Sequence, residues 1–138
     1  MHVVCDASIV LQWFHEEGEH EVDDARELLT AHRAGRLTAS ILDLTLFELG
    51  NVLLRALGWQ ARQVADQLDD LRTMCPIVRP GRDELRAAAS IAESHGLTFH
   101  DAVYAAAARL QADALATADP ALLESRTGER PGAILARL

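Results

Sequence analysis

The chain has 138 residues, of which 49% are hydrophobic and 25% are charged, so we expect a single domain, residues 1–138, with a core of its own. No apolar stretch reaches the roughly 18 residues needed to span a bilayer, and the N-terminus lacks the basic region and cleavage site of a signal peptide, which predicts a cytoplasmic protein with no membrane partner. The net charge of −8 argues against a protein that binds nucleic acid through charge alone, although an enzyme could still bind metal cations at an acidic site.

All 13 basic residues are arginine. Without lysine the chain has no P-loop lysine, no Schiff-base lysine and no lysine of the receiver or haloacid-dehalogenase type. The two cysteines, Cys5 and Cys75, have no zinc-site spacing, and we expect both to be buried thiols in a reducing compartment.

In the first half of the chain, short apolar runs alternate with helical periodicity. The stretch HVVC at 2–5 predicts a first strand, after which residues 7–15 turn into a helix. Three further elements are expected before residue 60: an amphipathic helix at 22–33 ended by Gly35, a short strand at 36–40, and a long helix at 41–57 that stops at Gly58. The long helix is apolar nearly all round, which is typical of a helix that is mostly buried.

The second half continues the alternation. We expect a helix at 60–74, a strand at 75–80, a helix at 83–95 ended by Gly96, an alanine-rich helix at 99–112, a strand and turn at 113–119, and a last edge strand or tail at 132–138. Strands that alternate with helices predict an α/β fold, with a parallel sheet of four to five strands and helices on both faces. In such sheets the functional residues lie at the carboxyl ends of the strands.

Carboxylates mark this edge of the expected sheet. Asp6 directly follows the first strand and Asp119 ends the last regular strand, so both belong at the carboxyl edge. A buried, ionised carboxylate needs a partner, which for Asp6 could be a helix N-terminus, an arginine or a metal. Glu48 interrupts the apolar helix one turn from Leu44 and from Val52, away from a solvated face. Neither Asp6 nor Glu48 has an obvious local role.

Asp101 lies in the first turn of the alanine-rich helix and completes the set. Helix capping is an alternative for Asp101 and for Asp119, which precedes Pro120, because acidic residues stabilise helix N-termini. Four carboxylates at one edge would repel each other at neutral pH. Mg²⁺ and Mn²⁺ would relieve that repulsion, because both prefer carboxylate and water oxygens. Such ions can activate water against a phosphodiester.

Four stretches carry a family resemblance: VVCDAS, LFELGNVLLR, LTFHDAVYAAAA and LATADPAL. They resemble the motifs of the PIN-domain ribonucleases, and within these the VapC-type toxins of bacterial toxin–antitoxin modules. The resemblance covers nearly the whole chain, with the motifs in the same order. It implies a PIN-like domain that hydrolyses single-stranded or looped RNA with water as the nucleophile and Mg²⁺, or alternatively Mn²⁺, as cofactor. It also implies a cognate antitoxin protein and a homodimer.

The resemblance further implies a role for each matching position. The fourth acidic position is the least uniform in the family, so the weight of Asp119 is the least certain of the set. The implied metal-binding and catalytic carboxylates are Asp6, Glu48, Asp101 and Asp119, and the implied supporting side chains are Ser8, Asn51 and Thr117.

Two alternatives remain open at this stage. A metal-dependent phosphatase on a doubly wound sheet would need a paired aspartate two residues after Asp6, where this chain has Ser8, and it would usually need a lysine. An inactive PIN-like binding module is the other, and the complete set of four carboxylates argues against it.

Several other residues have two interpretations each. Trp13 and Phe14 are candidates for an antitoxin groove or a dimer interface, or for the core. Arg55 and Arg109 could each contact a phosphate, or could be ordinary solvated arginines. His100, beside Asp101, is better explained as a helix-start residue than as a general base.

Overall fold

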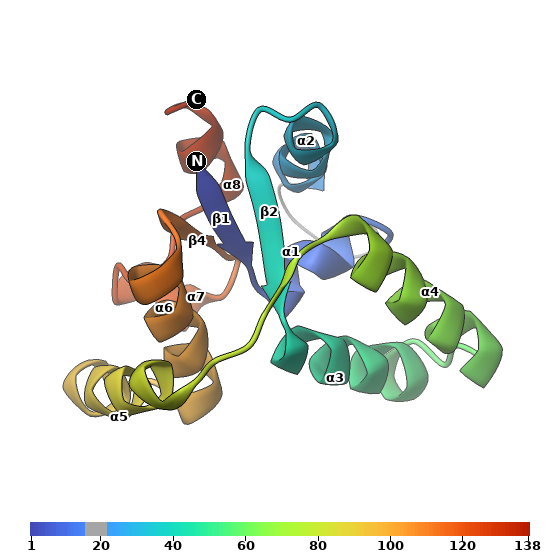
Figure 1. Cartoon of the computed structure of the whole chain (residues 1–138). Helices are drawn as coiled ribbons and strands as arrows, with labels where there is room; N and C mark the ends of the chain where they lie inside the picture. Colours follow the sequence, from blue (N-terminus) through green and yellow to red (C-terminus); the bar gives the residue numbers. More distant parts are fainter. Residues whose placement is uncertain (16–21) are drawn as a thin grey trace.

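The computed structural model describes residues 1–15 and 22–138. Its centre is a sheet of four parallel strands in the order β3-β2-β1-β4 (Figure 1). The strands are β1 (His2–Cys5), β2 (Thr38–Leu42), β3 (Ile77–Val78) and β4 (Ala114–Ala116). The predicted α/β fold with a parallel sheet is therefore confirmed, with four regular strands in the described part of the chain.

Helices cover both faces of the sheet because successive strand residues point to opposite sides. Val3 and Cys5 pack into one apolar cluster and Val4 into the other. The first cluster includes residues of α1 (Ala7–Gln12), α2 (Val22–Arg33), α4 (Ala61–Met74) and α8 (Pro131–Leu135). The second includes residues of α5 (Arg82–His95), α6 (Phe99–Gln111) and α7 (Pro120–Glu124). Cys5 and Cys75 are buried and free, as expected.

The long helix predicted at 41–57 begins later than expected. Ile41 and Leu42 pair with β3 and end β2, so the helix α3 covers Asp43–Asn51 and continues as a π-helix, η1, over Val52–Ala56. A short apolar run fits a strand or a helix equally well, and here pairing with β3 decides.

The expectation that this helix is mostly buried was wrong. Thr45, Leu49 and Leu53 are buried at a four-residue spacing, but Phe47 is 76% exposed and Leu54 is 43% exposed. Only one stripe of the helix packs against the domain, which leaves an apolar surface on the opposite side.

Residues 131–135 form the helix α8, so the edge strand predicted at 132–138 was wrong, and only the last three residues form a non-helical tail. Pro131 occupies the first turn of α8, where a missing N–H costs nothing, and Ile134 is fully buried. The helix docks on α2 so closely that a Cβ at Gly132 would lie 2.7 Å from the Asp24 carboxylate. The Asp24 side chain is exposed and would have to move to make room for a larger residue at 132.

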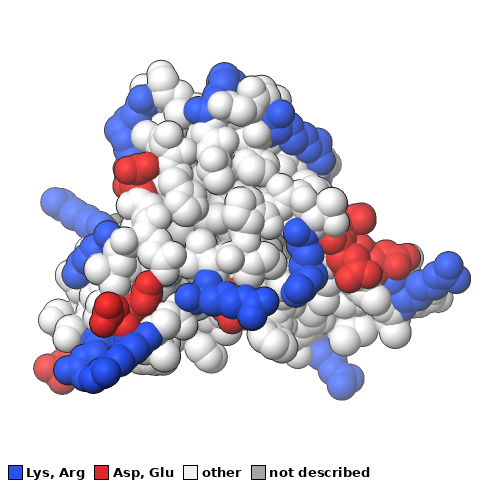
Figure 2. Space-filling model, viewed as in Figure 1, with Lys and Arg blue, Asp and Glu red and all other residues white. Residues whose placement is uncertain are grey.

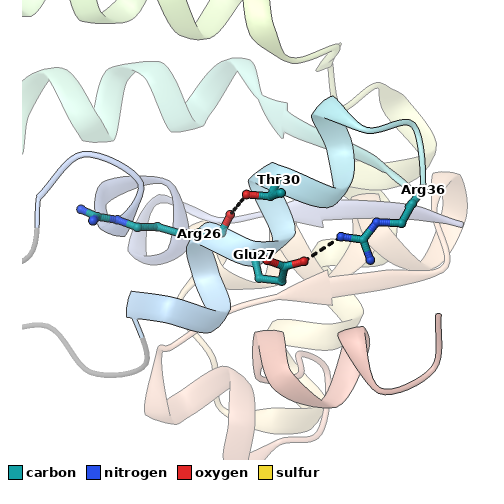
Figure 3. Close-up of polar contacts among 4 residues, drawn as sticks. All are labelled: Arg26, Glu27, Thr30 and Arg36. Atoms are coloured by element: carbon teal, nitrogen blue, oxygen red, sulfur yellow. Dashed lines mark hydrogen bonds and ion pairs between the residues drawn. The ribbon is translucent and has the colours of Figure 1, made fainter.

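Figure 3 shows polar contacts on the surface of α2, one within the helix and one between the helix and the turn that leads to β2. Thr30 donates to the carbonyl of Arg26 at 3.1 Å, and Arg36 forms an ion pair with Glu27 at 2.7 Å. Gly35 adopts a φ of 75°, as expected of the residue that ends this helix. None of the helices in the described ranges is long and apolar enough to cross a membrane.

Candidate active site

Asp6 lies between β1 and α1 and is only 4% exposed. Three groups donate to its carboxylate: the Ile9 N–H at 3.2 Å and the Ser8 hydroxyl at 2.6 Å to Oδ1, and the Thr117 hydroxyl at 2.5 Å to Oδ2. Asp6 is thus the N-cap of α1, a local role that the sequence interpretation missed. Of the partners expected for this buried carboxylate, the structure supplies the helix N-terminus and adds two hydroxyls.

The two hydroxyls also hold the segment that follows β4. Ser8 Oγ accepts the N–H of Ala118 at 2.9 Å, and Thr117 Oγ1 accepts the N–H of Asp119 at 2.9 Å. Each hydroxyl therefore joins Asp6 to the connection between β4 and α7. These contacts bring the carboxyl ends of β1 and β4 together as one rigid unit.

The aspartates at this edge share one electrostatic environment. The pKa of Asp6 is raised to about 6. Burial is the largest cause and the nearby charge of Asp119 contributes, while the three hydrogen bonds act in the opposite direction. Burial also raises the pKa of Asp101, and the charge of Asp119 again adds to the increase. The charge of Asp119 therefore lies close enough to Asp6 and to Asp101 to disfavour the charged form of each.

Helix capping explains part of this arrangement. Asp119 is the N-cap of α7, accepting the Ala121 N–H at 2.9 Å, with Pro120 as the first helical residue. The cap of α6 is Thr98, whose hydroxyl accepts the N–H of Asp101 at 3.2 Å. The capping alternative is thus right for Asp119, whereas the carboxylate of Asp101 is not needed for the cap.

We expect Asp119→Asn to separate capping from activity. Asparagine caps helices about as well as aspartate, so the free energy of unfolding should change by less than about 0.5 kcal/mol. If Asp119 also positions a metal or water, the cleavage rate should fall while the melting temperature stays the same. Thermal unfolding and a nuclease assay on the same preparation check this, and full activity in the variant would leave capping as the only role of Asp119.

Glu48 is bound by Tyr104, a residue that sequence analysis missed and whose pKa is raised by burial and also by the charge of Asp6. The Tyr104 hydroxyl donates to Glu48 Oε1 at 2.5 Å and lies 2.7 Å from the hydroxyl of Thr45, which accepts the N–H of Leu42. Because the Tyr104 proton is given to Glu48, the Thr45 hydroxyl donates to Tyr104. This chain of hydrogen bonds ties α6 to the start of α3 and orients Glu48.

A signal for Tyr104 was available in the sequence. It is the single tyrosine of the chain, within a run of alanines, and it follows Asp101 by three residues, which places both on one face of α6. Burial and the charge of Glu48 raise the pKa of Tyr104, so its hydroxyl remains a donor at all physiological pH values.

Tyr104→Phe should therefore weaken both the fold and the site. It removes the donor to Glu48 and leaves the buried Thr45 hydroxyl without an acceptor, which should lower the free energy of unfolding by about 1–3 kcal/mol. Nuclease activity should also fall, because Glu48 loses its orientation. Thermal unfolding and cleavage rates measure the two effects, and a Tyr104→Phe protein that equals wild type in both would show that the contact is incidental.

The other residues singled out from the sequence are mostly exposed. Asn51 is exposed at the end of α3 and makes no side-chain hydrogen bond within the described ranges. His100 is exposed in the first turn of α6, as expected of a helix-start residue. Arg55 is exposed on η1, and Arg109 lines a hollow of about 390 Å³ beside Ala114, at the opposite end of β4 from Asp119.

Trp13 and Phe14 differ in burial. Trp13 belongs to the core: it is 8% exposed, and its ring N–H donates to the carbonyl of Ala25 at 2.9 Å. Phe14 is half-buried, with its ring 5.9 Å from that of Trp59. Both line a hollow of about 340 Å³ between α1, α2 and α4.

The donor set suits a hard divalent cation, although it is not a closed cage. Within residues 1–15 and 22–138, no three Asp, Glu, His or Cys side chains are grouped closely enough to hold one ion between them. Mg²⁺ commonly uses only one or two carboxylates and completes its shell with water. The carboxylates of Asp6 and Asp101, each near the charge of Asp119, offer oxygen ligands of the kind that such an ion prefers.

The family model of the PIN domain matches residues 3–126 of the chain. The chain belongs to the PIN domain family. The family resemblance stated from the sequence is thereby confirmed. Comparison with curated proteins gives no match.

Solved structures share this PIN fold. PAE2754 from Pyrobaculum aerophilum is 25% identical with a TM-score of 0.70, covering 99% of this chain and 88% of its own. A toxin–antitoxin complex from Klebsiella pneumoniae is 18% identical with a TM-score of 0.70, covering 94% and 97%. VapBC2 from Rickettsia felis, bound to a DNA fragment from its promoter, is 17% identical with a TM-score of 0.63, covering 90% and 92%.

Proposed function

We propose that this PIN domain is a metal-dependent endoribonuclease that serves as the toxin of a toxin–antitoxin pair. The observation that carries the proposal is the buried carboxylate of Asp6, which three donors fix near the charge of Asp119 at the carboxyl edge of the sheet, where the charge of Asp119 also acts on Asp101. Membership of the PIN family, whose members are nucleases, supports hydrolysis of a phosphodiester. RNA as substrate, and the cytoplasm as the compartment, follow from the resemblance to VapC-type toxins.

Asp6 and Asp101, with Glu48 and Asp119 nearby, are the residues that would hold Mg²⁺ or Mn²⁺. When bound, the ion would supply a polarised water and neutralise charge on the phosphate. The protein's own part is to fix the carboxylates, through Ser8 and Thr117 for Asp6 and through Tyr104 for Glu48.

Arginine is the cation available for the RNA backbone, since the chain has no lysine. Figure 2 shows arginine side chains directly beside carboxylates along the lower edge of the view, the side to which the strands of Figure 1 point. A guanidinium can bind a phosphate through two hydrogen bonds, which favours arginine in this role. With a net charge of −8, we expect RNA binding to be local to such arginines and to weaken steeply with salt.

A protein partner is supported by the apolar surface left open on α3. Phe47 is 76% exposed and, with Leu46 and Leu68, lines a hollow of about 630 Å³ between α3 and α4. An amphipathic helix of an antitoxin, or a second copy of the chain in a homodimer, could cover this surface. Two of the similar structures are described as toxin–antitoxin assemblies, which favours the antitoxin.

The purified protein, a single-stranded RNA and a phosphomonoester test this proposal together. We expect internal cleavage of the RNA in Mn²⁺ or Mg²⁺, none in EDTA, and little release of phosphate from the monoester. Glu48→Gln protein, purified in parallel, controls for contaminating ribonuclease. Phosphate release without RNA cleavage would favour the phosphatase alternative, and RNA binding without either activity would favour an inactive binding module.

A further inference from the structure

The segment after α7 returns to the sheet next to the site. Glu129 donates to the carbonyl of Leu115 at 2.8 Å and accepts the N–H of Thr117 at 3.0 Å, so it pairs with the end of β4 like a short parallel strand. Gly128 precedes this pairing and is buried. Its own N–H is bound to the carbonyl of Leu122 at 3.1 Å, which fixes its backbone against α7.

Gly128 leaves no room for a side chain next to Thr117. A Cβ at Gly128 would lie 2.5 Å from Cγ2 of Thr117, 3.4 Å from Cδ2 of Leu115 and 3.5 Å from Cβ of Leu122. Gly128 does not have a positive φ, so its backbone conformation does not require glycine. What requires glycine here is the space occupied by the Thr117 methyl group.

The same Thr117 side chain carries two hydrogen bonds of the site. Its hydroxyl donates to Asp6 Oδ2 and accepts the N–H of Asp119. The methyl and the hydroxyl are attached to the same Cβ, so a steric contact that displaces the methyl also displaces the hydroxyl. Thr117 is fully buried and β-branched, which leaves it few other rotamers.

We infer that Gly128 is a positioning residue of the active site. Because glycine has no side chain, Thr117 has room to keep its hydrogen bonds to the Asp6 carboxylate and the Asp119 N–H. The inference rests on the proposed function for its consequence, which is that a larger residue at 128 weakens binding of the divalent ion. Residues that orient metal ligands typically change metal affinity by about 10–100-fold when they are altered.

Gly128→Ala and Thr117→Ser, singly and together, test this inference. Serine keeps the hydroxyl and removes the methyl that an alanine at 128 would strike. In the wild-type background, Gly128→Ala should lower the affinity of the apo protein for Mn²⁺ by about tenfold and lower the melting temperature. In the Thr117→Ser background, the same change should alter Mn²⁺ affinity less than about twofold.

Gly50→Ala is the matched control, because a Cβ there meets only Leu68 Cδ1, at 3.7 Å. Mn²⁺ affinity is read from the loss of free-ion signal in electron paramagnetic resonance, and folding from thermal unfolding in EDTA. If Gly128→Ala weakens Mn²⁺ binding equally in both backgrounds, or leaves it unchanged in the wild type, the inference is overturned. If wild-type protein itself binds no Mn²⁺, the proposed function fails, while a melting temperature restored by Thr117→Ser would still establish the steric contact.

Discussion

Asp6→Asn, Glu48→Gln and Asp101→Asn are each expected to reduce metal-dependent RNA cleavage by about a thousandfold, which corresponds to about 4 kcal/mol of transition-state stabilisation. The physical reason is that each change replaces a carboxylate that we propose as a ligand of the divalent ion by a neutral amide. Cleavage rates at saturating RNA and Mn²⁺ measure the effect.

The control variants make the same Asp→Asn and Glu→Gln changes at exposed carboxylates away from the site. Asp66 on α4 and Glu93 on α5 are both exposed, so Asp66→Asn and Glu93→Gln change the net charge equally without touching the site. Both should cleave RNA at nearly the wild-type rate. If any of the three site variants keeps most of its activity, that residue is not a ligand and its assigned role is wrong.

Asp6→Asn is also expected to melt at a higher temperature than wild type in EDTA at neutral pH. The folded-state pKa of Asp6 is about 6, above the unfolded value of about 3.9, so the folded protein binds more protons between these values. The stability of the apo wild type should therefore rise as the pH falls from 7 towards 4, with Asp6 contributing about 1 kcal/mol between pH 7 and pH 5. Above pH 6 that contribution is lost, because the buried carboxylate must be charged.

The asparagine variant carries no such charge, so its advantage over wild type should shrink as the pH approaches 5. Added Mn²⁺ should reverse the order at pH 7, because binding at a hundredfold excess over the dissociation constant stabilises the wild type by about 2.7 kcal/mol. Thermal unfolding of both proteins across this pH range, with Asp66→Asn as control, measures the difference. An Asp6→Asn protein that melts below wild type in EDTA would mean that Asp6 is mainly a structural acceptor.

Much of the fold follows from local pattern. The helix ends at Gly35 and Gly96, with φ of 75° and 67°, were predictable because glycine adopts this conformation readily. The Asp119 cap followed from the proline after it. The start of α3 was not predictable, because Ile41 and Leu42 become strand residues only through pairing with β3.

The site was predictable to a similar degree. That Asp6 and Asp119 share an edge follows from their places after parallel strands, and their electrostatic coupling agrees with it. Tyr104 could have been found from its spacing to Asp101. Gly128 could not, because its backbone is ordinary and the need for glycine arises only where a distant segment meets Thr117.

Product analysis of RNA cleaved in ¹⁸O-water gives the most direct test that these carboxylates form a metal-dependent ribonuclease site using water as nucleophile. With wild-type protein and Mn²⁺ we predict one ¹⁸O atom in a terminal phosphate monoester at each cleavage position, and no such product with Asp101→Asn or in EDTA. Products that end in a 2′,3′-cyclic phosphate without ¹⁸O, or cleavage that persists in EDTA, would contradict it.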